Sequence, residues 1–341
     1  MRIQHTDDPP NAETDLAALG PGATPLEHFY TRCNFPIPHL DGAAWRLEVS
    51  GAFDRPRTWT MDELQDLPYA ERTVTMECAG NGRTLMTPVP SGTPWGLGAV
   101  GTTRFGGIRL ADLLAAASLQ SGAADLVFAG ADHGEVEHDG HIPYEFNLGV
   151  APALEDGPML AWSMGGAPLS PEHGFPLRLV VPGDYGMRSV KWLIRITAAE
   201  QPFAGPFPRK YRYRGDPGVP EASSVGSIRV RSLISWPEDG AQLSAAPTTL
   251  SGIAWSGDGE IELVEVEVEG QWMPAEISKP LNGTGHVAWT LGWTPAGAGT
   301  HALAVRATDS AGHRQPESSI WNEGGYGNNS VHRISVTVGS G

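Results

Sequence analysis

The chain has 341 residues, of which 40% are hydrophobic and 18% are charged, and this length favours two globular domains. Its net charge of −16 at pH 7 argues against a nucleic-acid partner and against binding to an anionic membrane surface. No stretch is long and apolar enough to suggest a membrane span. Two cysteines, Cys33 and Cys78, are too few for a disulfide framework.

Residues 1–24, which begin MRIQHTDDPPNAET, lack the cationic start and apolar core of a secretory signal. We expect this segment to form a flexible lead-in. The expected location is the cytoplasm, or the periplasm if a leader was removed before this numbering begins.

Residues 25–220 have the pattern of a mixed α+β domain. Strands are predicted where short apolar runs are bounded by glycine and proline turns, at WRLEVSGAF, LVFAG, FPLRLVVPG and VKWLIRITAAE (45–53, 126–130, 175–183 and 190–200). Short helices are predicted where apolar residues recur every three or four positions, at MDELQDL and LADLLAAASL (61–67 and 110–119).

A bridge rich in proline, glycine and arginine covers residues 201–224, and the sequence pattern changes after it. From residue 221 to 341, apolar and polar residues alternate in short runs such as IELVEVEVEG, with turns at close intervals. This pattern is typical of an immunoglobulin-like β-sandwich. We therefore place the domain boundary at residue 220.

The stretch TVTMECAGNGR (73–83) places Cys78 between a predicted strand and a turn. Residues 73–76 suit a strand, and the glycines of Ala79-Gly80-Asn81-Gly82 suit a tight turn. Locally, Cys78 could be a small buried hydrophobe, which is the usual role of a free cysteine, or a nucleophile with a nearby base. It could also bind a metal whose other ligands come from a cofactor, since no further Cys or His lies at zinc-site spacing.

Four blocks, taken in chain order, decide among these roles. They are FYTRCNFPIP, TVTMECAGNGR, AWSMGGAPLSPEHGFPLRLVVPGDYGMRSVKWL and IWNEGGYGNNSVHRI (29–38, 73–83, 161–193 and 320–334). In this order they resemble the signature blocks of the sulfite oxidase family of molybdopterin enzymes. The resemblance implies a mixed α+β molybdopterin-binding domain followed by an Ig-like dimerisation domain, in agreement with the boundary drawn from composition.

The resemblance also implies a set of cofactor contacts. They match Tyr30, Thr31, Arg32, Cys33, Asn34, Cys78, Asp132, His173, Arg178, Ser189, Val190 and Lys191. Cys78 would be the one protein ligand of molybdenum, with the remaining sulfurs supplied by the pterin dithiolene. Arg178 and Lys191 are suitable partners for the pterin phosphate. Without the family, Arg178 would be interpreted as a half-exposed strand residue and Asp132 as part of a solvated acidic loop.

For the substrate pocket, the resemblance implies that sulfite binds among Arg32, Arg83, Trp95 and Tyr213. Tyr211 is the alternative to Tyr213, and the "YRG" segment favours Tyr213.

Three positions depart from the family pattern. Gly324 stands where these enzymes have a further pocket arginine, Gly82 replaces a basic residue, and Asn34 replaces a histidine. Loss of one charge-assisted contact would cost about 1.5–3 kcal/mol of anion binding. The pocket is therefore expected to bind sulfite weakly, or to accept a different or larger substrate.

The resulting hypothesis is a molybdenum cofactor oxidoreductase that oxidises sulfite to sulfate by oxygen-atom transfer. Its electrons would pass to an external acceptor such as a cytochrome c, because no CxxCH haem motif or haem domain is visible. A homodimer is implied by the resemblance. Because of Gly324, reduction of nitrate or a sulfoxide at the same cofactor is an alternative, and a non-catalytic Ig-like binding protein is a further one.

Overall fold

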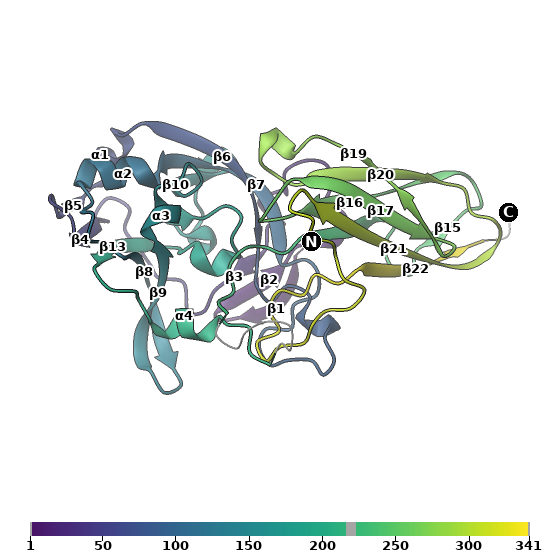
Figure 1. The fold of residues 1–341 in the computed structure, drawn as a ribbon, viewed down its shortest axis with the longest axis horizontal. Coiled ribbons are helices and arrows are strands. Elements are labelled where there is room, and N and C mark those ends of the chain that lie inside the picture. Colours follow the sequence, from purple (N-terminus) through teal and green to yellow (C-terminus); the bar gives the residue numbers. More distant parts are fainter. Residues whose placement is uncertain (1, 216–222, 340–341) are drawn as a thin grey trace.

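The computed structural model describes residues 2–215 and 223–339, and two sheet-rich halves lie end to end along its long axis (Figure 1). The predicted boundary at residue 220 lies outside the described residues. The helices are α1 (Met61–Gln65), α2 (Leu110–Ala117), α3 (Val150–Ala153) and α4 (Pro206–Lys210). Both predicted helices are confirmed as α1 and α2. Within the described ranges, no helix is long and apolar enough to cross a membrane.

Two five-stranded sheets form the body of the first half. One has the order β11-β10-β7-β6 with β12 on β10, and its strands are β6 (Tyr69–Glu77), β7 (Val100–Arg109), β10 (Met159–Met164), β11 (Ala167–Pro168) and β12 (Arg178–Val180). The other has the order β5-β4-β13-β8-β9, and its strands are β4 (Leu47–Gly51), β5 (Arg57–Trp59), β8 (Asp125–Val136), β9 (Gly140–Gly149) and β13 (Leu193–Ala199).

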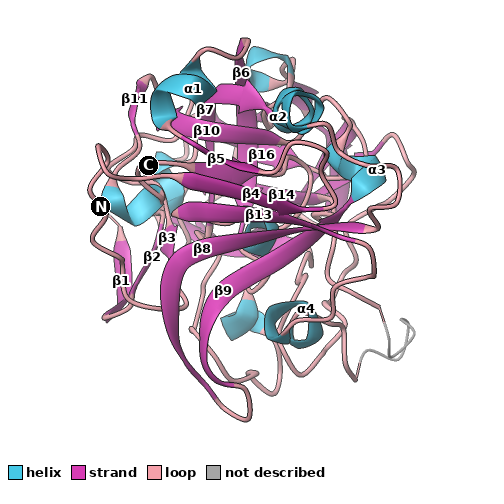
Figure 2. Ribbon diagram, turned by 90° about the vertical axis from the view of Figure 1, so that its left-hand side faces the viewer, coloured by secondary structure: helices cyan, strands magenta, loops and turns pink. Residues whose placement is uncertain are grey.

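The second of these sheets curves around the first half. Figure 2 shows β4, β13, β8 and β9 side by side, with the β8–β9 hairpin extending beyond the other strands. The four strand predictions for this half are confirmed by β4, β8, β12 and β13. Leu47, Phe128 and Ile196 on these strands are fully buried, because they contribute to the main hydrophobic core.

The N-terminal segment is ordered into strands, so the predicted flexible lead-in is wrong for residues 3–13. β1 (Ile3–Asp7) pairs with β2 (Pro10–Glu13), and β2 pairs with β3 (Thr31–Arg32). The Asn11 side-chain oxygen accepts hydrogen bonds from Arg32 Nη1 at 3.2 Å and from the Cys33 amide at 3.1 Å. The N-terminal segment is ordered because it pairs with residues distant in the sequence, and amino-acid composition does not reveal such pairing.

The second half is a sandwich of two sheets, as predicted. The first sheet has the order β14-β16-β20-β19, and its strands are β14 (Arg231–Trp236), β16 (Thr248–Trp255), β19 (Glu276–Ile277) and β20 (Val287–Trp293). The second has the order β15-β22-β21-β17-β18, and its strands are β15 (Gln242–Leu243), β17 (Ile261–Val268), β18 (Gln271–Pro274), β21 (Gly299–Asp309) and β22 (His332–Val338). Val264 and Val266 of β17 are buried in its core, as the alternating pattern predicts.

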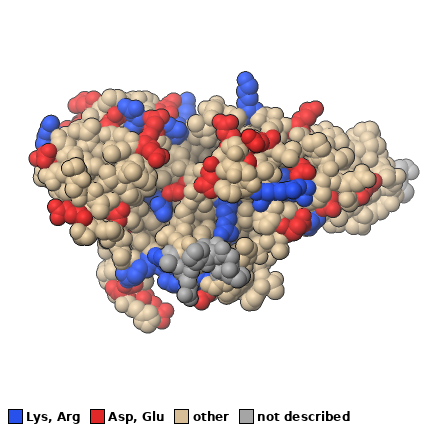
Figure 3. Space-filling view, in the orientation of Figure 1, with Lys and Arg blue, Asp and Glu red and all other residues tan. Residues whose placement is uncertain are grey.

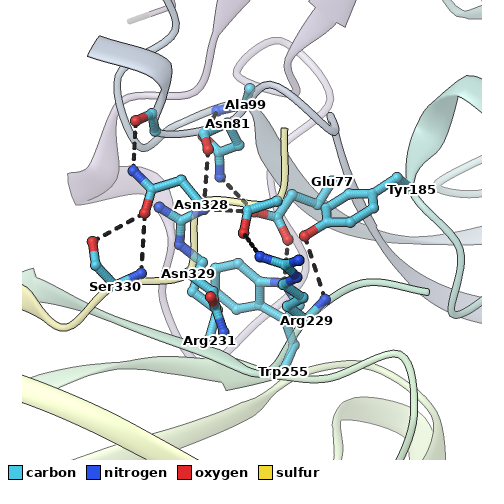
Figure 4. Close-up of polar contacts among 12 residues, drawn as sticks. Glu77, Asn81, Ala99, Tyr185, Arg229, Arg231, Trp255, Asn328, Asn329 and Ser330 are labelled. Carbon is cyan, nitrogen blue, oxygen red and sulfur yellow. Dashed lines mark hydrogen bonds and ion pairs between the residues drawn. The ribbon is translucent and has the colours of Figure 1, made fainter. Parts of the chain in front are cut away.

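Side chains of the two halves meet at the end of β6, beside Cys78. Glu77 and Arg231 are both 1% exposed and form an ion pair of 2.8 Å, while Trp255 Nε1 donates to the other Glu77 oxygen at 2.9 Å. Asn81 Nδ2 also donates to Glu77, at 2.9 Å (Figure 4). Because Arg231 and Trp255 belong to the sandwich, the strand end that presents Cys78 is held by both halves.

Candidate active site

Cys78 lies where β6 ends and the chain turns sharply. Its amide donates to the Ala99 carbonyl at 2.9 Å, and its carbonyl accepts from the Asn81 amide at 2.9 Å. Gly82, at the end of the turn, has a φ of +81°, and a Cβ there would lie 2.9 Å from an Arg231 guanidinium nitrogen. The turn therefore requires glycine at position 82, which explains the absence of a basic residue there.

Cys78 forms part of the wall of an inner cavity in the first half. Most of the predicted cofactor residues line this cavity, namely Tyr30, Arg32, Cys33, Asn34, Cys78, Asp132, His173, Arg178, Ser189 and Lys191. Thr31 and Val190 are not on its wall. The Thr31 hydroxyl accepts a hydrogen bond from Arg2 at 2.8 Å, and Val190 packs into the hydrophobic core.

Further residues of the inner wall were not predicted. They are Phe29, Met76, Ala79, Tyr144, Gly186, Met187, Trp192 and Tyr211. Six of them lie inside the sequence blocks quoted above, so the blocks were the available signal. Tyr144 and Tyr211 lie outside those blocks. Tyr211 was considered only as the alternative to Tyr213 for the substrate pocket, and no local pattern distinguishes Tyr144.

A buried basic cluster occupies one part of the inner cavity. Arg178 donates to the His173 carbonyl at 3.0 Å, its Nε has no hydrogen-bond partner, and burial lowers its pKa to about 10. Lys191 Nζ donates to the Glu172 carbonyl at 2.7 Å and to Cys33 Sγ at 3.1 Å. Burial and the positive charge of Lys191 lower the pKa of His173, so its imidazole is neutral at pH 7. Buried cations with unused donor atoms are suited to bind a phosphate.

Two acidic groups of the inner cavity are destabilised in their charged forms. Burial raises the pKa of Asp132 to about 7, although Lys191 and Arg32 oppose the effect, and its Oδ1 has no hydrogen-bond partner. Burial also raises the pKa of the Cys78 thiol, and Arg32 offsets this only in part. A thiolate at Cys78 therefore needs an additional cation, which a metal ion would provide.

A second cavity of about 370 Å³, here called the outer cavity, also has Cys78 on its wall. Arg32, Cys78 and Tyr211 line both cavities, and Arg83 and Trp95 line the outer one. The structure thus brings together three of the four residues predicted for the substrate pocket. Tyr213 lines neither cavity, because its ring packs against the Arg229 guanidinium at 4.5 Å. Of the two tyrosines considered for the pocket, Tyr211 is therefore the one that lines the cavities.

Comparison with known proteins identifies the family. Residues 34–207 match the oxidoreductase molybdopterin binding domain, and residues 223–339 match the Mo-co oxidoreductase dimerisation domain. The chain is 32% identical to the sulfite oxidase of Arabidopsis thaliana, over 97% of this chain and 93% of that protein. The chain belongs to the sulfite oxidase family of molybdopterin-dependent oxidoreductases. Membership argues against the alternative of a non-catalytic binding protein.

Other relatives within this family differ in length. The chain is 34% identical to the mitochondrial sulfite oxidase of Macaca fascicularis over 92% of its own length, and it spans 62% of that protein. It is 31% identical to the NAD(P)H nitrate reductase of Hordeum vulgare, of which it spans 39%. The solved structure of the sulfane dehydrogenase SoxCD from Paracoccus pantotrophus has the same fold, with a TM-score of 0.85 and 24% identity over 97% of this chain and 85% of that one.

The inner cavity provides what the cofactor of this family requires. The thiol of Cys78 is a soft ligand, and in the described ranges no group of three or more His, Cys, Asp or Glu could hold a metal. A metal at Cys78 must therefore bring its other ligands with it, as a dithiolene does. The unpartnered Asp132 Oδ1 can accept a hydrogen bond from a pterin N–H, and the unpartnered Arg178 Nε can donate to its phosphate.

Gly324 has a structural reason for lacking a side chain. A Cβ at this position would lie 2.2 Å from a ring carbon of Tyr326, so no larger residue fits beside that ring. The Gly324 carbonyl accepts hydrogen bonds from Arg83 Nε at 3.2 Å and from Arg83 Nη2 at 2.9 Å. In this member of the sulfite oxidase family, an aromatic ring and a carbonyl form the wall where the resemblance implied an arginine.

The rim of the outer cavity is strongly basic. Lys210, Arg212 and Arg214 line it together with one carboxylate, Glu323, and sequence reasoning assigned none of them to the site. In Figure 3, acidic side chains are scattered over both halves, and some of the Lys and Arg side chains lie near the junction between the halves. A local cluster of cations can attract an anion despite the net charge of −16.

Proposed function

We propose that this chain holds a molybdenum–molybdopterin cofactor in the inner cavity and oxidises sulfite to sulfate at the outer cavity. The observation that carries the proposal is the position of Cys78 on the walls of both cavities. If the Cys78 sulfur binds the metal, the metal would lie between the inner cavity, which would hold the cofactor, and the outer cavity, which would bind the anion. When bound, the cofactor supplies the oxygen-atom transfer and the two-electron chemistry. Relatives named sulfite oxidase support sulfite as the substrate.

The residues of the inner cavity would hold the cofactor through complementary charge. Cys78 would bind the metal, and Arg178, Ser189 and Lys191 would hold the phosphate. Asp132 would accept a hydrogen bond from the pterin, which removes the cost of its unpaired oxygen.

In the outer cavity, the chain's own residues would bind and orient the oxyanion. Arg32 and Arg83 supply positive charge beside Cys78. Burial raises the pKa of Tyr211, so its phenol keeps its proton and can donate a hydrogen bond to a substrate oxygen. Trp95 is fully buried and closes the cavity to water on its side.

Electrons would leave one at a time to an external acceptor such as a cytochrome c. The sandwich would form a homodimer, which the match to the dimerisation domain supports.

The direct test is sulfite-dependent reduction of ferricyanide by protein loaded with molybdenum. We expect turnover by the wild type and none by Cys78→Ser. Molybdenum content, measured in both proteins, separates loss of the metal from loss of turnover. A fully loaded wild type without sulfite turnover would contradict sulfite as the substrate.

Nitrate reduction at the same cofactor is a second candidate, because the chain is 31% identical to a nitrate reductase and Gly324 leaves the pocket without a further cation. Nitrate carries a single charge and needs fewer cationic partners than doubly charged sulfite. Nitrate-dependent oxidation of reduced methyl viologen measures this activity. A kcat/KM for nitrate above that for sulfite would favour the second candidate.

A further inference from the structure

The walls of the outer cavity change in chemical character from the buried end to the rim. Buried Arg83 and partly buried Arg32 lie with Cys78, the buried rings of Tyr211 and Tyr326 form another part of the wall with centroids 5.1 Å apart, and Lys210 lies at the exposed rim. Building on the function proposed above, we propose that the preferred substrate is a small organic sulfinate, R–SO₂⁻, whose organic part carries a second anionic group.

The buried end offers few free hydrogen-bond donors. The Gly324 carbonyl takes hydrogen bonds from Arg83 Nε and Nη2, and the Thr93 carbonyl takes one from Nη1 at 2.7 Å. Arg32 Nη2 donates to the Asn34 side chain at 2.6 Å. With several donors already engaged, the two guanidiniums have few N–H groups left for an anion, which favours an oxyanion with two oxygens over sulfite with three. A sulfinate is sulfite with one oxygen replaced by carbon, and it carries one charge.

The wall formed by the two tyrosines is suited to the organic part. Tyr326 and Tyr211 are 6% and 7% exposed, and the Tyr326 ring covers the position where a side chain of residue 324 would project. Burial raises the pKa of Tyr326, so the ring carries no charge at neutral pH. The carbon of a sulfinate can pack against these rings, whereas the third oxygen of sulfite would be placed against an apolar face. The volume of about 370 Å³ also leaves room for more than a four-atom anion.

The rim is suited to a second anion. Within the part of the chain that the structure describes, the Lys210 ammonium forms no hydrogen bond or ion pair, whereas the Lys210 carbonyl accepts a hydrogen bond from the Arg212 amide at 3.0 Å. Lys210 lines the same cavity as Arg32 and Arg83. Partial burial, followed by the charges of these two guanidiniums, lowers the pKa of Lys210. A carboxylate on the organic part would give Lys210 a partner while the sulfinate contacts the buried end.

The reaction balances without a further co-substrate. The sulfur lone pair of R–SO₂⁻ accepts an oxygen atom, and a new S–O bond gives R–SO₃⁻. The oxygen comes from water, whose two protons pass to solvent. The two electrons pass, one at a time, to a one-electron acceptor, for which ferricyanide serves in the assay.

The test compares sulfite, methanesulfinate and 3-sulfinopropanoate as substrates of the molybdenum-loaded protein. We expect kcat/KM to be highest for 3-sulfinopropanoate and lowest for sulfite. Lys210→Gln should raise KM for 3-sulfinopropanoate about two- to fivefold with unchanged kcat, and should raise KM for methanesulfinate by a smaller factor. Lys279→Gln, at an exposed position of the sandwich, is the matched control and should change neither KM.

Tyr326→Ala should raise KM for both sulfinates more than for sulfite, and Tyr326→Phe should preserve most of the preference for sulfinates.

Binding of the product analogues gives a readout that does not depend on turnover. Calorimetry should show tighter binding of 3-sulfopropanoate than of sulfate, and Lys210→Gln should remove most of the difference. Sulfite turnover that depends on Cys78 and exceeds both sulfinates would overturn the sulfinate proposal and leave the proposed function intact. Absence of turnover with all three substrates would reject the proposed function, and the calorimetry would then decide whether the cavity prefers a dianion with an organic body.

Discussion

Asp132 shows how the inner cavity depends on a bound partner. Its carboxyl is 4% exposed, its Oδ1 has no hydrogen-bond partner, and burial raises its pKa to about 7. Lys191 and Arg32 favour the ionised form but do not restore the pKa of 3.8 that is usual for an aspartate. Ionised Asp132 therefore destabilises the cofactor-free protein, and a hydrogen-bond donor from the cofactor would relieve this.

The sign of the pH effect follows from the raised pKa. Between pH 3.8 and about 7 the folded protein binds a proton at Asp132 that the unfolded chain releases, so stability falls as the pH rises. Asp132→Asn removes this titration. In the cofactor-free protein, the stability of the variant relative to wild type should rise by about 2–3 kcal/mol between pH 5 and pH 8.

Urea unfolding at the two pH values measures this difference. Asp66→Asn, at an exposed aspartate near the end of α1, is the matched control. Parallel pH profiles for wild type and Asp132→Asn would contradict the assignment of this cost to Asp132.

Single residues of the site differed in how far the sequence could predict them. The position of Cys78 at the end of a strand was predictable from the glycine-rich turn that follows, whereas its role as a metal ligand came only from the resemblance to the family. The choice between Tyr211 and Tyr213 was not, because α4 ends at Lys210 and Tyr211 caps it with a φ of −84° and a ψ of 75°. Tyr326 was not predictable either, because its ring occupies the space that a side chain at position 324 would need.

At the scale of elements, the end of β6 joins the two halves of the molecule. Glu77 and Arg231 are 1% exposed and reside on β6 and β14, so each charge is neutralised by the other half. Removal of one partner from a buried pair costs about 3–5 kcal/mol, because the other charge is left uncompensated. The same change would loosen the turn that presents Cys78.

Arg231→Met should therefore lower the free energy of unfolding by about 3–5 kcal/mol. The double variant Glu77→Gln/Arg231→Met should recover part of the loss, because no buried charge remains. The matched control is Arg104→Met, which removes a surface pair with Glu71 and should cost less than about 1 kcal/mol. Equal losses for Arg231→Met and Arg104→Met in urea unfolding would refute this account of the junction.

Elements with a local pattern were predictable and those held by distant partners were not. α2 and β17 show clear three-to-four and two-residue periods, and both formed where expected. β1 and β2 consist largely of polar residues, and their order depends on pairing with β3 and on the buried Asn11 side chain. Such long-range contacts leave no periodic signal in a single sequence.

At the scale of the whole molecule, the sandwich is expected to form the dimer contact. Sedimentation equilibrium should give twice the 36.2 kDa of one chain. Removal of residues 223–339 should give a monomer or unfolded protein, because Arg231 and Trp255 would no longer neutralise and hydrogen-bond Glu77. A monomeric full-length chain at micromolar concentration would contradict the expectation.

The central claim is that Cys78 connects the two cavities as a ligand of molybdenum. X-ray absorption at the molybdenum edge counts the sulfur atoms bound to the metal and tests this claim most directly. We expect the loaded wild type to have one sulfur ligand more than loaded Cys78→Ser, and Cys33→Ser to match the wild type. An unchanged sulfur count in Cys78→Ser would show that the metal does not bind this cysteine.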